Sequence, residues 1–128
     1  MPNPRIPLII CFLLTSLLLG CAAPTPTPAA VTQPVPEQHQ RGAELFQANC
    51  ASCHGDGAVG TDRGPTFLHK IYESSHHSDA SFQRAVKQGV TPHHWDFGPM
   101  PPVPDVSEED VTAITGYVRW LQSQVGIH

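Results

Sequence analysis

The sequence lacks the short motifs of several common enzyme classes. It contains no H-E-x-x-H pair, no phosphate-cradling loop ending in Gly-Lys-Ser/Thr, and no serine-nucleophile motif. Basic residues are also few: seven Lys and Arg stand against eleven Asp and Glu, for a formal net charge of −4. A net negative charge argues against nucleic acid as a partner.

Long apolar runs are missing as well. The run from Ile6 to Leu19 is shorter than the roughly 18–20 residues that a membrane-spanning helix needs. Preceded by a basic start at Arg5, it is typical of a secretory signal peptide. Leu18-Leu19-Gly20-Cys21 resembles the lipobox of bacterial lipoproteins, which implies cleavage before Cys21 and acylation of its thiol. A transmembrane anchor and a soluble periplasmic protein with an idle Cys21 are the alternatives; we favour the lipoprotein.

Cysteines are few, and each has an expected fate. Cys11 leaves with the signal peptide, Cys21 takes lipid, and Cys50 and Cys53 remain as a pair, so no thiol is left for a disulfide. Loss of Arg5 changes the net charge to −5, with six basic residues against eleven acidic ones. Residues 1–20 are therefore the expected signal peptide.

The segment 21–40 is expected to be a tether. It holds five prolines, among Thr, Ala and Gln, and the prolines are Pro24, Pro26, Pro28, Pro34 and Pro36. Proline-rich linkers extend by about 3.1 Å per residue, so the tether would lift a domain some 50 Å above a membrane. Plain disorder would give the same reach.

The most specific motif is Cys50-Ala51-Ser52-Cys53-His54. It reads C-x-x-C-H, the attachment signature of c-type haem, in which both thiols bind the haem and His54 ligates the iron. On a helix, all three side chains share one side. A thioredoxin-like pair lacks its strand-helix-strand context here, and a structural zinc site lacks a second pair of ligands. We therefore favour haem attachment.

The flanking residues carry a family resemblance. In order, they resemble a class I monohaem cytochrome c over about residues 40–124. The matching motifs are Gly42-x-x-Leu45-Phe46-x-x-Asn49, Cys50-x-x-Cys53-His54-Gly55, Gly64-Pro65, Met100-Pro101-Pro102 and Ile114-x-x-Tyr117. The resemblance implies an all-α cytochrome c fold, with three to five helices around one covalently bound haem c, in a domain at 41–128.

The resemblance also implies the iron's surroundings. His54 and Met100 would be the axial ligands, and the carbonyl of Pro65 would accept a hydrogen bond from the second ring nitrogen of His54. The alternative for Gly64-Pro65 is a simple turn. Trp95 would donate its indole N–H to a haem propionate, or simply pack.

Helical patterns agree with this fold. Apolar residues recur at three-four spacing from about Glu37 to Cys53, and Gly42 would let another helix cross closely; by resemblance, that partner is the C-terminal helix. Ser78 would cap a helix over 79–88 that Gly89 ends. Ser107 would cap the last helix, whose apolar face is expected to hold Val111, Ile114, Tyr117, Val118, Leu121 and Val125.

Histidines compete with Met100 as distal ligand. Five of them fall within 26 residues, namely His69, His76, His77, His93 and His94. An imidazole on the iron would lower the potential relative to methionine, and a switch to His93 or His94 is conceivable. The bland interpretation is that they are solvated or bond propionates. We also consider a second metal site, for copper, at His76, His77, His93 and His94.

We expect a membrane-tethered, extracytoplasmic one-electron carrier rather than an enzyme. With His54 and Met100 both on iron, no position is open for substrate. The expected partners are a redox donor and acceptor and, through the lipid, a membrane; the domain is expected to be monomeric. The alternatives are a haem sensor or enzyme with a displaceable distal ligand, a copper-handling module, and a subunit through which electrons enter a larger oxidoreductase.

Overall fold

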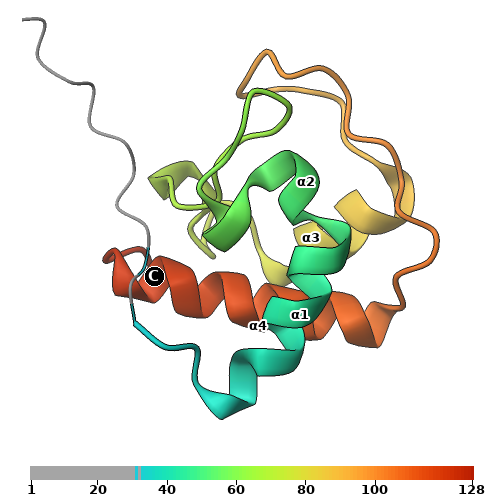
Figure 1. Ribbon diagram of the computed structural model, residues 1–128. Coiled ribbons are helices and arrows are strands. Elements are labelled where there is room, and N and C mark those ends of the chain that lie inside the picture. Colours follow the sequence, from blue (N-terminus) through green and yellow to red (C-terminus); the bar gives the residue numbers. More distant parts are fainter. Residues whose placement is uncertain (1–30, 32) are drawn as a thin grey trace, which may run out of the picture.

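The computed structural model describes residue 31 and residues 33–128 (Figure 1). The expected signal peptide, Cys21 and most of the tether lie outside them. Within the described part the chain forms four α-helices and two 3-10 turns, without a named strand. The elements are α1 (Glu37–Asn49), α2 (Ala51–His54), η1 (Asp56–Ala58), η2 (Lys70–Tyr72), α3 (Asp79–Gln88) and α4 (Glu108–Gln124). The expected all-α fold is confirmed.

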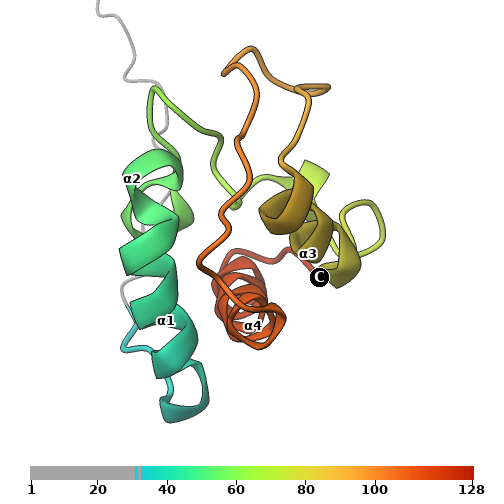
Figure 2. The same cartoon turned by 90° about the vertical axis from the view of Figure 1, so that its right-hand side faces the viewer.

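The crossing of α1 and α4 is the centre of the fold (Figures 1 and 2). It depends on Gly42, because a Cβ there would collide with the backbone carbonyl of Ala113 and lie 3.0 Å from the Cβ of Tyr117. The close crossing expected at Gly42 is thus present. An ion pair between Arg41 and Asp110, at 2.7 Å, closes one edge of the crossing.

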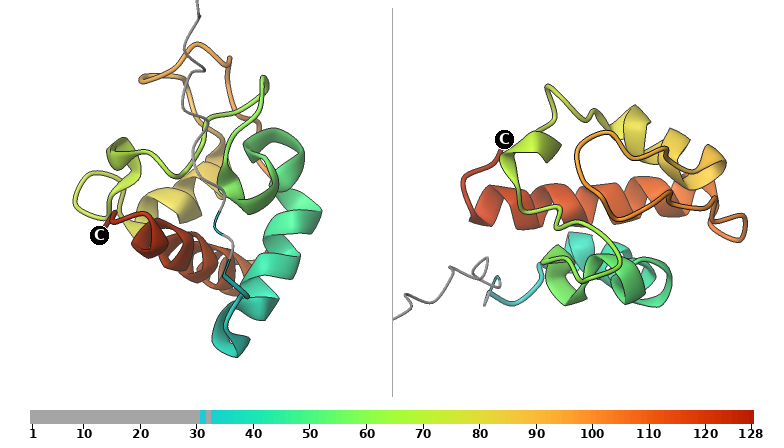
Figure 3. Two further views of the ribbon diagram at one scale, coloured as in Figure 1. Left: turned by 60° about the vertical axis from the view of Figure 1, so that its left-hand side comes forward. Right: turned by 90° about the horizontal axis from the view of Figure 1, so that it is seen from above.

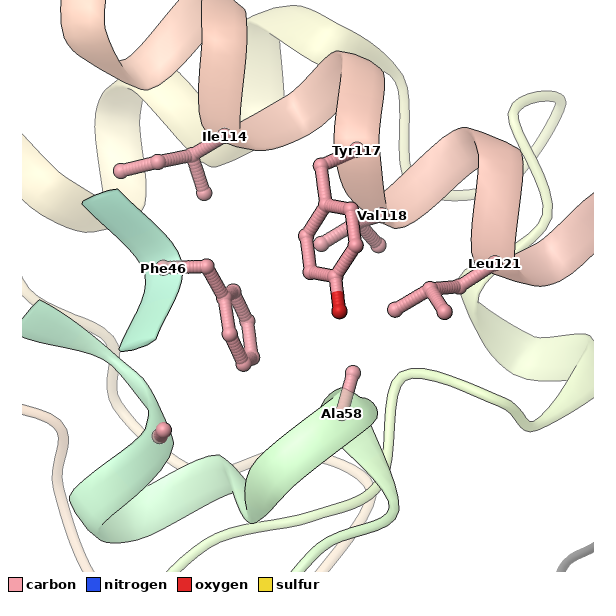
Figure 4. Packing of buried hydrophobic residues seen from close by; sticks show 7 residues of the cluster. Phe46, Ala58, Ile114, Tyr117, Val118 and Leu121 are labelled. Carbon is pink, nitrogen blue, oxygen red and sulfur yellow. The ribbon is translucent and has the colours of Figure 1, made fainter. Parts of the chain in front are cut away.

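The hydrophobic core lies along this crossing. Phe46 of α1 is only 1% exposed and meets the ring of Tyr117 edge-on, with centroids 5.7 Å apart (Figure 4). Val118 and Leu121 continue the same face of α4, and Ala58 of η1 closes it from the other side. The buried cluster is small and includes Phe46, Ala51, Ala58, Ile114, Tyr117, Val118 and Leu121. Such a small core leaves little stability in reserve.

Replacing Gly42 with alanine is expected to lower the free energy of unfolding of the haem-loaded protein. The added methyl group has to push α4 away, and overpacking of this kind costs about 1–3 kcal/mol. Urea titration followed by helical circular dichroism measures the loss. Gly116→Ala is the matched control, because its added Cβ meets only the His39 ring at 3.9 Å; alanine there should gain about 0.5–1 kcal/mol. Equal stability of Gly42→Ala and the parent would contradict the tight crossing.

The helices α3 and α4 lie where the sequence predicts them. Three details differ from the expectations, at Ser78, Cys50 and Val125. Ser107 caps α4, its hydroxyl accepting from the amide of Asp110 at 3.1 Å, whereas Ser78 precedes α3 without a side-chain cap bond. The continuous helix expected up to Cys53 is interrupted at Cys50, whose φ of −121° separates α1 from α2. Val125, expected on the buried face, is 39% exposed because α4 has ended before it.

No helix in the described part of the chain is both long enough and apolar enough to cross a membrane. The helix α1 begins at Glu37, inside the segment expected to be a tether, and Val35 packs against the core just before it. The domain boundary at residue 41 stays a prediction.

Candidate functional site

The C-x-x-C-H motif lies on one short turn of helix. Cys50 precedes α2, and its carbonyl accepts from the amides of both Cys53, at 3.1 Å, and His54, at 2.9 Å. These bonds wind the five residues into a single turn. Both thiols are free, with Cys50 half-buried and Cys53 exposed. The two sulfur atoms and the imidazole therefore come from one rigid unit.

One ring nitrogen of His54 is engaged in a hydrogen bond. Its Nδ1 lies 2.9 Å from the carbonyl oxygen of Pro65, so Nδ1–H donates and Nε2 keeps its lone pair. This is the contact that the family resemblance implies. The ring is 9% exposed and stacks on Phe67, with centroids 4.2 Å apart. Burial lowers the pKa of His54, against a smaller opposing effect of the bond to Pro65. A neutral, oriented imidazole results, as a metal ligand requires.

The loop that carries Pro65 is tied back to α2. The hydroxyl of Thr61 donates to the carbonyl of Cys53 at 2.5 Å, and the guanidinium of Arg63 donates to the carbonyl of Ser52. At Gly64 a Cβ would lie 2.9 Å from the oxygen of Cys53, so the loop packs directly on the helical turn. These contacts fix Pro65 relative to His54.

The thiols do not resemble a redox-active pair. Burial, with a smaller contribution from Cys53, raises the pKa of Cys50 to about 11. Attacking thiols of thioredoxin-like proteins have a lowered pKa. The environment of Cys50 therefore does not favour the disulfide-exchange alternative.

Met100 lies on a different segment, where its backbone pairs with that of Val90; we call this pair of residues the neck. The amide of Val90 donates to the carbonyl of Met100, and the amide of Met100 donates to the carbonyl of Val90, both at 3.0 Å. This bridge closes the segment 91–99 into a loop, which follows α3 and rises on the same side of the fold as the loop after α2 (Figure 1). Figure 3 shows the same loop from two further directions. In the view of Figure 2 the chain after Met100 descends between α2 and α3 to the start of α4.

Gly89 makes the neck possible. Its φ of +76° with ψ of −178° is a conformation nearly restricted to glycine, and a Cβ there would lie 2.5 Å from the oxygen of Met100. The glycine expected to end α3 therefore also admits the carbonyl of Met100.

Gly89→Ala is expected to open the neck. Strain of about 1–3 kcal/mol corresponds to a 5- to 150-fold increase in opening, which amide hydrogen exchange at Val90 and Met100 would measure. Gly98→Ala is the matched control, since Gly98 has a similar φ of +81° in the same loop but open space around its Cβ position. Exchange at Met100 that rises equally in both variants would show that the contact at Gly89 does not hold the neck.

Trp95 lies in the loop with its indole nitrogen buried. Among the described residues, Nε1 has no hydrogen bond of standard geometry, although it lies near the Tyr72 hydroxyl, whose pKa burial raises and Trp95 partly lowers. The ring meets His69 edge-on with centroids 5.1 Å apart. A buried N–H without a partner is costly. Donation to a haem propionate is one of the two roles expected for Trp95, and the propionate would supply the acceptor.

The histidines divide into three groups. His76, His77 and His94 come together, with ligand atoms all within 4.8 Å of one another. His93, the fourth residue expected at a second metal site, is outside this set and pairs its Nδ1 with the carbonyl of Thr91. His69 accepts from the amide of Ile71 at 3.1 Å and caps η2.

Sequence reasoning missed two polar residues of α4. Gln122 is 1% exposed and donates to the carbonyls of Phe67 and Tyr72, at 2.9 and 3.1 Å. Arg119 pairs with Asp79 at 2.9 Å and donates to the carbonyl of Tyr72 at 2.7 Å. The sequence signal that could have indicated their burial is their position next to Val118 and Leu121 on the apolar face of the helix. They hold the segment between Phe67 and α3 on α4.

Comparison with known proteins decides the family. Residues 37–118 match the family described as cytochrome c oxidase, cbb3-type, subunit III. The chain belongs to this family. As a member of the cbb3-type subunit III family, it is a c-type cytochrome with a covalently bound haem c and a role in electron transfer. The expected class I cytochrome resemblance and haem c cofactor are confirmed.

The chain is also similar to a protein that carries a different subunit name. Cytochrome c oxidase subunit 2 of Alkalihalophilus pseudofirmus is 30% identical over 106 residues, covering 73% of this chain and 29% of the relative. The chain thus spans less than a third of that relative's length. No solved structure matches the chain.

The described residues fit the haem that the cbb3-type subunit III family implies. Two free thiols and an imidazole with one uncommitted nitrogen lie on one turn. The buried indole N–H of Trp95 lacks an acceptor that a propionate would provide. Each of these groups has a counterpart in haem c.

Proposed function

We propose that the protein is a membrane-tethered, extracytoplasmic one-electron carrier whose haem iron is ligated by His54 and Met100. The observation that carries the proposal is the hydrogen bond from His54 to Pro65, because it commits Nδ1 and leaves Nε2 for iron on the turn that presents both thiols. The haem supplies a metal centre that gains and loses one electron.

The protein's own residues would hold and orient this centre. Cys50 and Cys53 would bind it covalently, and the turn of α2 would set the imidazole beside them. Pro65 would keep the ring of His54 in place and raise its basicity. Phe67, stacked on the imidazole, excludes water from that side.

Met100 is the proposed second ligand. The neck at Val90 fixes its backbone by two hydrogen bonds, and Pro101 and Pro102 stiffen the chain beyond it. A restrained loop loses less entropy on ligation than a flexible one. Among the competing histidines, His76, His77 and His94 are engaged with one another, and His93 bonds Thr91, which favours the thioether.

The tether and anchor belong to the same proposal. Residues 1–20 would be removed, Cys21 would carry lipid, and residues 21–40 would connect it to the domain at 41–128. Cytochrome c domains of this family are typically extracytoplasmic. A Cys21→Ala variant should move from the membrane fraction to the soluble fraction, and mass spectrometry of the mature N-terminus should find acylated Cys21 only in the parent.

The partners are proposed to be redox proteins. The family and the relative carry the names of oxidase subunits, and electron delivery into a larger oxidoreductase is compatible with both. An acidic domain would dock on a basic patch of its partner. Purification from its native membrane, followed by identification of co-purifying haem proteins, tests this part.

The central experiment compares absorption spectra of the ferric and ferrous protein, with and without carbon monoxide. Six-coordinate ligation by His54 and Met100 predicts the weak far-red ferric band that sulfur ligation gives in this family, and no carbon monoxide adduct at an intact fold. Ready binding of carbon monoxide to the native ferrous protein would instead favour a sensor or an enzyme.

A further inference from the structure

The three clustered histidines belong to two segments that are distant in sequence. His76 and His77 follow η2, and their amides both donate to the carbonyl of Glu73, at 3.0 and 2.8 Å. His94 comes from the loop closed by the neck at Val90. The Nε2 atoms of His76 and His94 face each other at 3.3 Å. Two ligands of a tetrahedral Zn²⁺, each about 2.0–2.1 Å from the ion, are separated by roughly this distance.

His77 is oriented as a metal ligand would be. Its Nδ1–H donates a hydrogen bond to the carbonyl of Ile71 at 2.7 Å, which leaves the lone pair of Nε2 free to bind a metal ion. Metal-binding histidines usually donate their other ring N–H in this way. The backbone of His77 is also anchored, because the guanidinium of Arg119 donates to its carbonyl. The ring therefore faces His76 and His94 in a fixed direction.

The chemistry of the three ligands narrows the choice of ion. The group of three contains no carboxylate. A purely imidazole set suits Zn²⁺ and Cu²⁺ rather than Mg²⁺ or Ca²⁺.

We propose that His76, His77 and His94 form a three-imidazole binding site for a divalent late transition-metal ion, Zn²⁺ or Cu²⁺, separate from the haem iron. The ion would join the turn after η2 to the loop 91–99 and leave a fourth position for water. His93 is not a ligand, although its ring lies 4.2 Å from that of His94, centroid to centroid. The proposal holds with Met100, or any other residue outside this group of three, as the distal haem ligand.

The test uses the haem-loaded full-length protein in its ferric state, freed of other metals with a chelator that is then removed. Equilibrium dialysis against Zn²⁺ alone and against Cu²⁺ alone gives the number of ions bound per haem. We expect one ion per haem, and at least about tenfold weaker binding in His76→Gln and in His94→Gln. His93→Gln is the matched control, since it removes a neighbouring imidazole outside the set; its affinity should change by less than about threefold.

X-ray absorption at the zinc or copper edge distinguishes the two ions without interference from iron. Three imidazole ligands in four-coordinate tetrahedral geometry indicate a Zn²⁺ site, and a tetragonal arrangement with the same three imidazoles indicates a Cu²⁺ site. Helical circular dichroism and haem absorbance must be unchanged in each variant. The proposal is overturned if neither ion binds at one per haem, if His94→Gln binds as the parent does, or if His93→Gln loses the ion.

Discussion

A chain carrying Cys50→Ala and Cys53→Ala is expected to emerge from a haem-attaching host without covalent haem. Both thiols lie on the turn that ends at His54, and the described part of the chain contains no other free cysteine. The measurement is haem staining after denaturing electrophoresis, supported by the intact mass. Ser52→Ala is the control, because Ser52 lies between the two thiols and is exposed; it should keep its haem. Pigment that remains attached to the double variant would contradict the assignment.

The same variant should also be poorly folded. Its buried cluster contains only one large aromatic ring from α1, Phe46, and a single face of α4. Haem would add the apolar mass that a domain of this size otherwise lacks. We expect loss of most helical circular dichroism and rapid proteolysis, whereas the Ser52→Ala protein should resist both. A haem-free chain that unfolds cooperatively near the temperature of the haem-loaded parent would refute this expectation.

Met100→Ala is expected to leave the haem attached but to change its ligation. Loss of the thioether should abolish the far-red ferric band, open the ferrous iron to carbon monoxide, and lower the reduction potential. The decrease should be on the order of 0.1–0.3 V, within the range of about 0.8 V that axial ligands span. Potentiometric titration measures it.

His93→Gln and His94→Gln are the controls for Met100→Ala, because these residues share the loop with Met100. Neither should alter the far-red band or the potential by a comparable amount. If a histidine is the true distal ligand, the result reverses: one histidine variant changes the spectrum and Met100→Ala does not.

The sequence predicted the helices because local signals and packing agree there. Ser107 and Gly89 mark their ends, and Phe46 and Tyr117 fall on the faces that meet at Gly42. The interruption at Cys50 was not predictable, since nothing in its neighbours breaks a helix. The turn that follows is bonded through the carbonyls of Ser52 and Cys53 to Arg63 and Thr61 of the loop, which are distant contacts that no local signal reveals.

Contacts between residues distant in sequence were also not predicted. Arg119 and Gln122 bond carbonyls about 40 to 55 residues away, and no periodic pattern announces such partners. The histidines illustrate the same limit. Their density suggested a cluster, but only the structure separates His93 from His94 by what each ring contacts.

The paired hydrogen bonds between Val90 and Met100 fasten the two ends of the loop 91–99 to each other. Apart from its histidines and Trp95, which contact His69, His76 and His77, the loop can vary in composition while this closure holds the backbone of Met100 in place. The exposed residues 96–99 therefore offer engineers a place to graft a foreign recognition peptide without disturbing these contacts.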